Sequence, residues 1–334
     1  MGESRGEPST LDKTNEISQL SKRQARHSGT VPDGVRPFRP LWGYASFIPL
    51  IHLLAMLALV PWLFSWTGVV LVFAGHYCFG MLGLTLGYHR LLTHRGFACP
   101  KWFEHFLAIL GVCCLQDTPA RWAAVHRKHH QYSDESPDPH SPLVSFLWGH
   151  FGWLVVENRQ HSRVDFYERY ARDLLRDPFY LRLERGGLWF WIYLGHAVVF
   201  FLAGFAFGWA TTQTLLGGLQ LGLSVLVWGV FVRTVLVWHV TWSVNSLSHI
   251  WGYRNYETTD NSRNNWLVGL VAHGEGWHNN HHAQQRAAAH GHRWWECDLT
   301  FLTIRLLEAI GLVKDVIRPR PDLTDSLTES NRAH

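Results

Sequence analysis

The chain has 334 residues, of which 47% are hydrophobic and 17% are charged, and this composition excludes a disordered or collagen-like chain. Its formal net charge of +4 comes from 30 Lys and Arg against 26 Asp and Glu, a balance that does not indicate a nucleic-acid-binding surface. Five cysteines without a CxxC pair support neither a disulfide framework nor a cysteine zinc site. The unusual counts are 22 histidines and 18 tryptophans, which indicate a metal-binding protein in a membrane.

The first segment, residues 1–40, is polar and lacks the apolar run of a secretory signal peptide. We interpret it as a disordered cytosolic tail. Apolar stretches follow, each free of Lys, Arg, Asp and Glu and each close to the roughly 20 residues that a helix needs to cross a bilayer. The four predicted spans are 47–66, 68–88, 188–209 and 214–232.

Very short connections join the first two spans and the last two, so each pair is expected to form a tight helical hairpin. Every Lys and Arg then falls on one side, and the excess of positive charge typical of the cytoplasmic face places both termini and the regions 89–187 and 233–317 in the cytoplasm. The run Trp102–Leu115 carries Glu104 and His105 and is short, which predicts an interfacial or buried helix rather than a fifth span.

The sequence therefore predicts an all-α membrane protein with four transmembrane helices in two hairpins. The membrane domain covers residues 41–317 and includes a cytoplasmic helical part. The final segment, 318–334, is rich in Ser, Thr, Asp and Glu and is expected to be a second disordered tail.

Histidines recur at the spacing of one helical face. The segments 126–130 (HRKHH) and 278–282 (HNNHH) each hold histidines at positions i, i+3 and i+4, which lie on the same side of a helix. His89 and His94 follow the second predicted span directly. A fourth element follows the last span, where residues four apart share a face: Thr241, Asn245 and His249.

All four elements fall on the predicted cytoplasmic side. So many crowded imidazoles would repel one another on protonation unless a metal held them neutral. Their number exceeds the four ligands of one zinc ion, so two metal ions are predicted; imidazole suits zinc, copper, iron and nickel, and ligand type does not choose among them. Isolated histidines inside the spans are interpreted as hydrogen-bonded interior residues: His52, His76 and His196.

Four motifs in this order closely resemble the membrane-bound fatty acyl desaturases of the stearoyl-CoA (delta-9) type: HRLLTHRGF, WAAVHRKHHQYSD, NSLSHIWGYR and GEGWHNNHH. The resemblance covers roughly Trp42 to Val313. It implies an enzyme that uses dioxygen, two electrons and two protons to form a cis double bond, at delta-9, in a saturated C16 or C18 acyl chain. It also implies a cofactor of two non-haem iron ions.

The resemblance carries the family's site residues onto this chain by motif position. Asn245 would reach one iron through a water. Gln116, Trp122 and Thr241 match the residues that bend the substrate tunnel in animal relatives, and Trp242 is assigned to substrate binding with them. The implied iron ligands are His89, His94, His126, His129, His130, His249, His278, His281 and His282.

One departure from the family's pattern concerns the substrate carrier. An Arg–Asp pair that contacts the CoA headgroup in animal relatives is Ala124–Val125 here, and a nearby asparagine corresponds to Asp117. Acyl-CoA and acyl-lipid substrates both remain open. Three basic residues could meet a phosphate or form a solvated or lipid-facing edge: Arg121, Arg127 and Lys128.

Carboxylates near the motifs are expected to accept the free N–H of ligand histidines rather than to act as an acid–base pair. They are Asp134, Glu135, Asp138 and Glu275. The HPGG motif of the family's fused cytochrome domain is absent, so electrons are expected from a separate protein, a ferredoxin or a cytochrome b5-like protein with a reductase.

Two other interpretations stay open. One is a fatty acyl or alkyl hydroxylase of the same di-iron superfamily, which product analysis would separate from a desaturase. The other is a non-catalytic membrane protein that binds or transports metal. A transport pore should place ionisable residues inside the spans, and these spans carry only scattered histidines.

Overall fold

The computed structural model describes residues 29–320, and within this range the chain is helical, without a β-strand. Four helices here are long and apolar enough to cross a membrane: Trp42–Leu59, Trp66–Thr93, Leu188–Thr212 and Leu215–Leu247. The predicted all-α architecture and the four predicted spans are confirmed at this level, although the helices differ from the predicted spans in their ends.

The first long helix, α2 (Trp42–Met56), begins before residue 47 because the residues that precede the predicted span are uncharged and do not end it. Two 3-10 turns follow, η2 (Leu57–Leu59) and η3 (Pro61–Leu63). The next helix, α3, starts at Trp66, where the Ser65 hydroxyl accepts a hydrogen bond from the backbone N–H of Gly68 at 2.9 Å. The connection is therefore longer than predicted.

The second long helix extends beyond its predicted end at residue 88. Helix α3 (Trp66–Gly75) continues into the π-helical segment η4 (His76–Thr93). Arg90 does not end this helix, because its buried guanidinium pairs with Glu275 and Asp298, each at 2.8 Å. A charge compensated inside the protein is compatible with a continuous helix.

The last long helix likewise continues beyond residue 232. Segments α11 (Leu215–Leu226), η7 (Val227–Val232) and α12 (Arg233–Leu247) follow one another without a break. Arg233 is fully buried and donates hydrogen bonds to the carbonyl oxygen of Cys113 and to His196 Nε2, both at 2.8 Å. His196 is thus the hydrogen-bonded interior residue that we expected.

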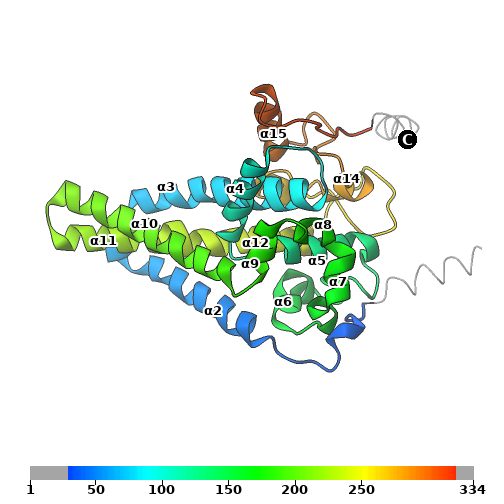
Figure 1. Ribbon diagram of the computed structural model, residues 1–334, viewed down its shortest axis with the longest axis horizontal. Helices are drawn as coiled ribbons and strands as arrows, with labels where there is room; N and C mark the ends of the chain where they lie inside the picture. The colour runs from blue at the N-terminus through cyan, green and yellow to red at the C-terminus, as the bar shows by residue number, and fades with distance from the viewer. Residues whose placement is uncertain (1–28, 321–334) are drawn as a thin grey trace, which may run out of the picture.

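The long helices run along the longest axis of the molecule (Figure 1). Helix α10 (Leu188–Thr212) lies along α11, and a Cβ on Gly208 would come within 2.5 Å of the Gly217 carbonyl oxygen, so only glycine permits this approach. Helices α2 and α3 instead pack against η7 and α12, which lie between them. The last long helix, rather than α2, is the main neighbour of α3.

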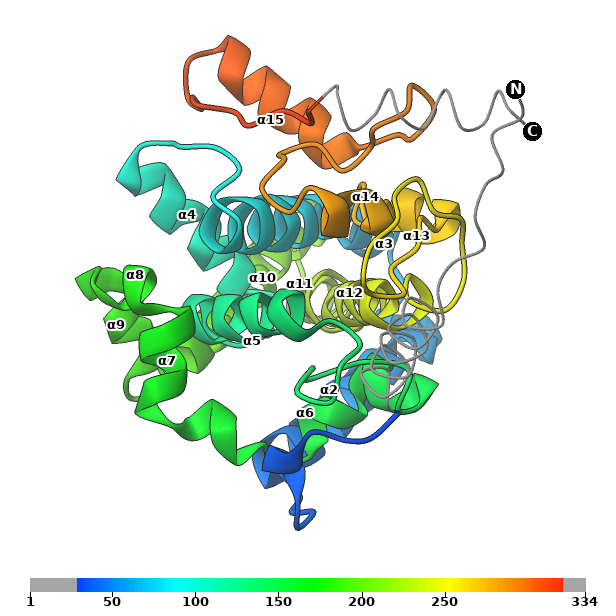
Figure 2. The same cartoon turned by 90° about the vertical axis from the view of Figure 1, so that its right-hand side faces the viewer.

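Most of the shorter helices gather toward the end of the bundle that lies opposite the turn between α10 and α11 (Figures 1 and 2). Helix α4 (Lys101–Val112) packs against η4 through Phe103 and Leu107 and exposes Trp102 and Phe106, as expected for an interfacial or buried helix. The remaining short helices are α5 (Pro119–Tyr132), η5 (Trp148–Gly152), α6 (Trp153–Val155), η6 (Arg159–Ser162), α7 (Val164–Tyr170), α8 (Arg172–Leu175), α9 (Pro178–Glu184), α13 (Trp266–Val271), α14 (His278–Ala283) and α15 (Leu299–Ala309).

The two segments that we interpreted as disordered tails lie largely outside the described residues, namely at 1–28 and 321–334. Nearer the body, the turn η1 (Asp33–Val35) buries Val35. At the other end, the backbone N–H of Arg320 donates to Gln284 Oε1 at 2.8 Å. A short part of each segment therefore packs on the helical body.

Candidate metal centre and adjoining cavity

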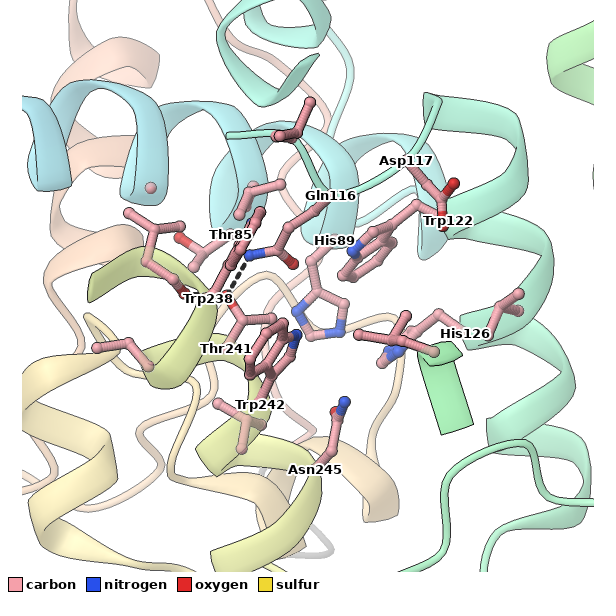
Figure 3. A pocket seen from close by; sticks show the side chains of 18 of the residues that line it. Thr85, His89, Gln116, Asp117, Trp122, His126, Trp238, Thr241, Trp242 and Asn245 are labelled. Carbon is pink, nitrogen blue, oxygen red and sulfur yellow. Dashed lines mark hydrogen bonds between the residues drawn. The ribbon is translucent and has the colours of Figure 1, made fainter. Parts of the chain in front are cut away.

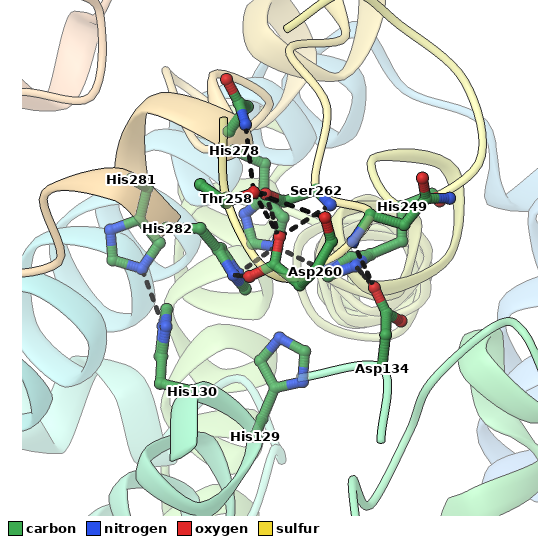
Figure 4. A network of polar contacts seen from close by, with 12 residues as sticks. His129, His130, Asp134, His249, Thr258, Asp260, Ser262, His278, His281 and His282 are labelled. Atoms are coloured by element: carbon green, nitrogen blue, oxygen red, sulfur yellow. Dashed lines mark hydrogen bonds and ion pairs between the residues drawn. The ribbon is translucent and has the colours of Figure 1, made fainter. Parts of the chain in front are cut away.

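The nine predicted ligand histidines meet at one end of the bundle. They come from η4 and the residue that follows it, from α5, from the turn after α12, and from α14. Figure 4 shows those of α14, the turn after α12 and the end of α5. Helices α5 and α14 each present their histidines on one face, as the i, i+3, i+4 spacing predicted. Eight of the nine side chains are buried and His130 is half-buried.

The nine histidines divide into two groups, within each of which one nitrogen per ring lies within 4.8 Å of all the others. The five-histidine group is His89, His94, His126, His130 and His281. The four-histidine group is His129, His249, His278 and His282. Neighbours in sequence go to different groups, so α5 and α14 each contribute to both.

The nitrogen positions fit metal ligation. His130 Nε2 lies 2.9 Å from both His126 Nε2 and His281 Nε2, and His278 Nε2 lies 3.1 and 3.0 Å from His249 Nε2 and His282 Nε2. A neutral ring nitrogen forms one in-plane hydrogen bond, so it cannot bond to two such partners. Two nitrogens bound at about 2.1 Å to one ion at right angles would lie about 3.0 Å apart. The nitrogens of each group therefore converge as ligands do.

Burial keeps most of these rings neutral. The pKa values of His94, His126, His130 and His281 in the five-histidine group are lowered well below the usual value, first by desolvation and then by neighbouring imidazoles. The same causes lower the pKa values of His129 and His278 in the other group. A neutral imidazole offers the lone pair that a metal requires.

Carboxylates contact the Nδ1 atoms of several of these rings, on the side away from the converging Nε2 atoms. This role was expected for four carboxylates, and three of them have it. His249 Nδ1 contacts Asp134 at 2.9 Å, His129 Nδ1 contacts Asp138 at 2.9 Å, and His89 Nδ1 contacts Glu275. These contacts place the ring proton on Nδ1 and leave Nε2 for a metal. Desolvation opposes protonation of His249, but Asp134 outweighs it and raises its pKa to about 9. In the described part of the chain, the Glu135 side chain contacts none of the nine histidines.

A fourth carboxylate with this role was not predicted. Asp260 accepts a hydrogen bond from His282 Nδ1 at 2.7 Å, and Thr258 and Ser262 hold its other oxygen at 2.9 and 2.5 Å (Figure 4). It lies in a loop without helical periodicity, so its only sequence signal was an acidic residue between two histidine motifs.

Two further buried histidines border the centre and were also missed. His140 lies beside His129, with ring centroids 4.3 Å apart, and His290 lies beside His281 at the same centroid distance. Neither His140 Nδ1 nor either nitrogen of His290 has a hydrogen-bond partner in the described structure. His140 has no neighbouring histidine in the sequence, and His290 has only His292 two residues later, so neither shows the helical spacing of the other motifs.

A largely apolar cavity of about 270 Å³ adjoins the metal centre. Its wall includes His89, His126 and His278 from the metal centre. Its lining also includes Tyr44 and Asp117, which hydrogen-bond to each other, and the neighbouring rings of His76 and His273. The residues predicted for substrate binding, and the predicted water-bridging asparagine, all line it (Figure 3): Gln116, Trp122, Thr241, Trp242 and Asn245.

A polar contact crosses the cavity wall beside the histidines. Gln116 Nε2 donates to Thr241 Oγ1 at 3.0 Å, and Thr241 Oγ1 donates to the carbonyl oxygen of Val237 at 2.9 Å. Trp122 stacks on His126, with ring centroids 4.9 Å apart. Gln116 and Thr241 are thus already paired with each other, and the apolar surface around them is suited to an alkyl chain.

The three basic residues considered for phosphate binding are engaged within the protein. Arg121 lies 3.5 Å from Asp117, whose carboxylate also accepts a hydrogen bond from Tyr44. Arg127 pairs with Asp173 at 2.7 Å. Lys128 Nζ donates to Gln160 at 2.7 Å, and burial lowers the pKa of Lys128 to about 8.

Comparison with known proteins agrees with this geometry. A family model described as fatty acid desaturase matches residues 61–305. The sn-1 stearoyl-lipid 9-desaturase of Synechocystis sp. is 39% identical over 293 residues, covering 87% of this chain and 85% of the relative. A protein of the same name from Anabaena variabilis is 41% identical over 275 residues, covering 82% and 93%.

A plant relative named acyl-CoA C20 Delta5-desaturase, from Anemone leveillei, is 40% identical over 273 residues, covering 82% of this chain and 80% of the relative. Relatives with different carriers and positions thus share the same level of identity. What they have in common is the reaction class. The chain therefore belongs to the fatty acid desaturase family, and it is an oxidoreductase.

Proposed function

We propose that the protein is an oxygen-dependent acyl-lipid desaturase, which introduces a cis double bond at delta-9 into a saturated C16 or C18 chain. The observation that carries the proposal is the opening of both histidine groups, through His89, His126 and His278, onto one apolar cavity. The reaction consumes O2, two electrons and two protons, removes two hydrogens from adjacent methylenes, and releases two molecules of water.

Each histidine group would hold one iron ion, with Asn245 positioned in the cavity wall to reach one of them through a water. The bound irons would supply the oxidising chemistry that an unactivated C–H bond requires. The chain itself contributes binding and exclusion of water: burial of the alkyl chain is worth about 0.8 kcal/mol per methylene. Carbons far from the reaction therefore supply the energy that positions the reacting pair.

Gln116, Trp122 and Thr241 would position the reacting carbons, because Trp122 stacks on His126 and the Gln116–Thr241 pair lies in the wall of the same cavity. We expect Thr241→Val to reduce turnover about tenfold to a hundredfold, since Gln116 would lose its partner at a cost of roughly 1–3 kcal/mol. The measurement is fatty-acid analysis after expression in cells that lack delta-9 activity. Thr211→Val, at the far end of α10, is the matched control. A hydroxylated product from the wild type would overturn the proposal in favour of a hydroxylase.

The charges around the cavity favour a glycerolipid over CoA as the carrier of the acyl chain. Arg121, Arg127 and Lys128 are all engaged within the protein, and Asp117 adds a carboxylate to the cavity wall. A polyanionic CoA would find no free cation among these residues, whereas a neutral glycerolipid would meet hydrogen-bonding groups.

Purified enzyme with a reducing partner should therefore desaturate stearoyl glycerolipid at least about tenfold faster than stearoyl-CoA, a difference of about 1.4 kcal/mol. Asp117→Asn releases Arg121 from its ion pair and should raise the use of stearoyl-CoA relative to the lipid. Preferential desaturation of stearoyl-CoA by the wild type would contradict the acyl-lipid assignment and leave the desaturase assignment intact.

Electrons would arrive at a polar depression lined by His94, His130 and three arginines. His130 is the one predicted ligand of the nine that is half-buried rather than buried. Arg95 and Arg127 share the single carboxylate of Asp173, so with Arg286 the rim keeps a net positive charge, which suits an acidic electron carrier such as a ferredoxin. The arginines are Arg95, Arg127 and Arg286.

We propose that both termini and the metal centre lie on the cytoplasmic side, as the distribution of Lys and Arg predicts. Single cysteines introduced at the exposed positions Gln131 and Gln285 should react with a membrane-impermeant label only after the membrane is opened, and one at the exposed Thr211 should react on intact cells. Labelling at Gln131 on intact cells would reverse the proposed topology.

A further inference from the structure

The cavity does not end in an apolar wall, although most of its lining is apolar. It follows one face of η4, where residues four apart lead away from the metal centre: Leu84, Gly80 and His76. His76 lies thirteen residues before His89, a distance of at most about 20 Å along the helix. His273, directly after α13, lines the same end, and the ring centroids of the two histidines are 4.5 Å apart.

Each of these histidines has a buried nitrogen without a partner. His76 Nε2 lies 2.9 Å from the carbonyl oxygen of Val271, so it carries the ring proton and leaves Nδ1 as an acceptor. His76 Nδ1 and His273 Nε2 are both buried and have no hydrogen-bond partner in the described structure. His76, which we expected to be hydrogen-bonded inside its span, therefore has a hydrogen-bond partner at only one of its two ring nitrogens.

The backbone at His273 provides a second, independent observation. Helix α13 ends with hydrogen bonds from Gly274 N to Gly269 O (2.7 Å) and from His273 N to Leu270 O (3.4 Å). This pattern places His273 in the left-handed position, with φ of 57°, that glycine usually occupies. Thr300 holds it there by donating its N–H and its hydroxyl to the His273 carbonyl oxygen, at 3.0 and 2.8 Å. His273 thus keeps a side chain at a backbone position where glycine would be less strained.

We propose that the His76–His273 end of the cavity is a binding site for a terminal hydroxyl group, so that the enzyme accepts acyl chains that carry a hydroxyl at the end remote from the ester. This inference rests on the proposed function, in which the polar carrier lies beside Asp117 and the chain terminus lies among the helices, along η4 toward His76. A hydroxyl can donate to His76 Nδ1 and also meet His273 Nε2, whereas a methyl group leaves both unpaired.

The test compares three glycerolipid-bound chains of equal length in competition: one ending in methyl, one in hydroxyl and one in fluorine, which cannot donate. Displacement of a spin-labelled stearoyl lipid from the purified protein measures their affinity, and product ratios measure kcat/KM. Wild type should bind the hydroxyl-ended chain about tenfold more tightly than the methyl-ended and fluorine-ended chains, because a site built for a hydroxyl rejects analogues without one.

His76→Phe keeps an aromatic ring, and His273→Asn keeps a residue that tolerates the left-handed conformation. Each variant should abolish this preference. His52→Phe is the control, since His52 also contacts a backbone carbonyl (Ile48, 2.7 Å) within a span but does not line the cavity. Equal affinity for the three chains in wild type, which is the result if water alone occupies the site, would overturn the inference. Failure to desaturate the methyl-ended chain would instead overturn the proposed function, and the displacement assay would still report on the hydroxyl site.

Discussion

His278→Ala should reduce the metal content of protein grown with iron from about two ions per chain to about one, and should abolish desaturation. His278 belongs to the four-histidine group, and its Nε2 lies within 3.1 Å of two other ring nitrogens of that group. Its loss leaves three histidines, fewer than the four ligands usual for a structural site. Metal analysis of the purified protein measures the effect.

His130→Ala provides a comparison, because it removes a ligand from the five-histidine group and leaves four. We expect a smaller loss of metal for His130→Ala than for His278→Ala. His52→Ala is the control, since His52 belongs to neither group and contacts the backbone carbonyl of Ile48 at 2.7 Å. Zinc found after overexpression would not contradict iron, since zinc also binds imidazole well. Full retention of both metals in both ligand variants would remove these residues from the ligand set.

Asp260→Asn should weaken metal binding by the four-histidine group about tenfold to a hundredfold without unfolding the protein. The carboxylate accepts a hydrogen bond from His282 Nδ1 at 2.7 Å and favours the tautomer with a free Nε2. Asparagine keeps the shape of the side chain and can still accept, but it removes the charge that raises the basicity of the ring. Competition with a chelator measures the affinity, and the melting temperature reports on folding.

Asp165→Asn is the matched control, because Asp165 is exposed and pairs only with the exposed Arg163. Asp134→Asn acts through His249 in the same group and should give a loss of similar size. Wild-type affinity in both Asp260→Asn and Asp134→Asn would show that these carboxylates orient loops rather than ligands.

The sequence determined the features that depend on local periodicity and composition. Four apolar stretches were long enough to cross a bilayer, and four long helices correspond to them. The i, i+3, i+4 spacing placed the histidines of α5 and α14 on single helical faces, because 3.6 residues per turn is a property of the backbone. The motif positions also singled out Gln116, Trp122 and Thr241, and all three line one cavity.

Helix ends were decided by contacts distant in sequence. The predicted spans stopped before Arg90 and Arg233, because a charge facing lipid would end a span. Both arginines are instead buried and paired, Arg90 with Glu275 and Asp298 and Arg233 with Cys113 and His196. Neither partner set can be identified from the residues near each arginine, so the helices extend further than local sequence indicated.

Tertiary structure also decided how the ligands divide between two groups. His129 and His130 are adjacent in sequence, yet they belong to different groups, because successive residues on a helix point about 100° apart. Which group each one joins depends on where α14 and the turn after α12 pack against α5. Asp260 and the His76–His273 pair became visible for the same reason: each combines a side chain with a partner from a separate helix or loop, and only the packing of the chain brings them together.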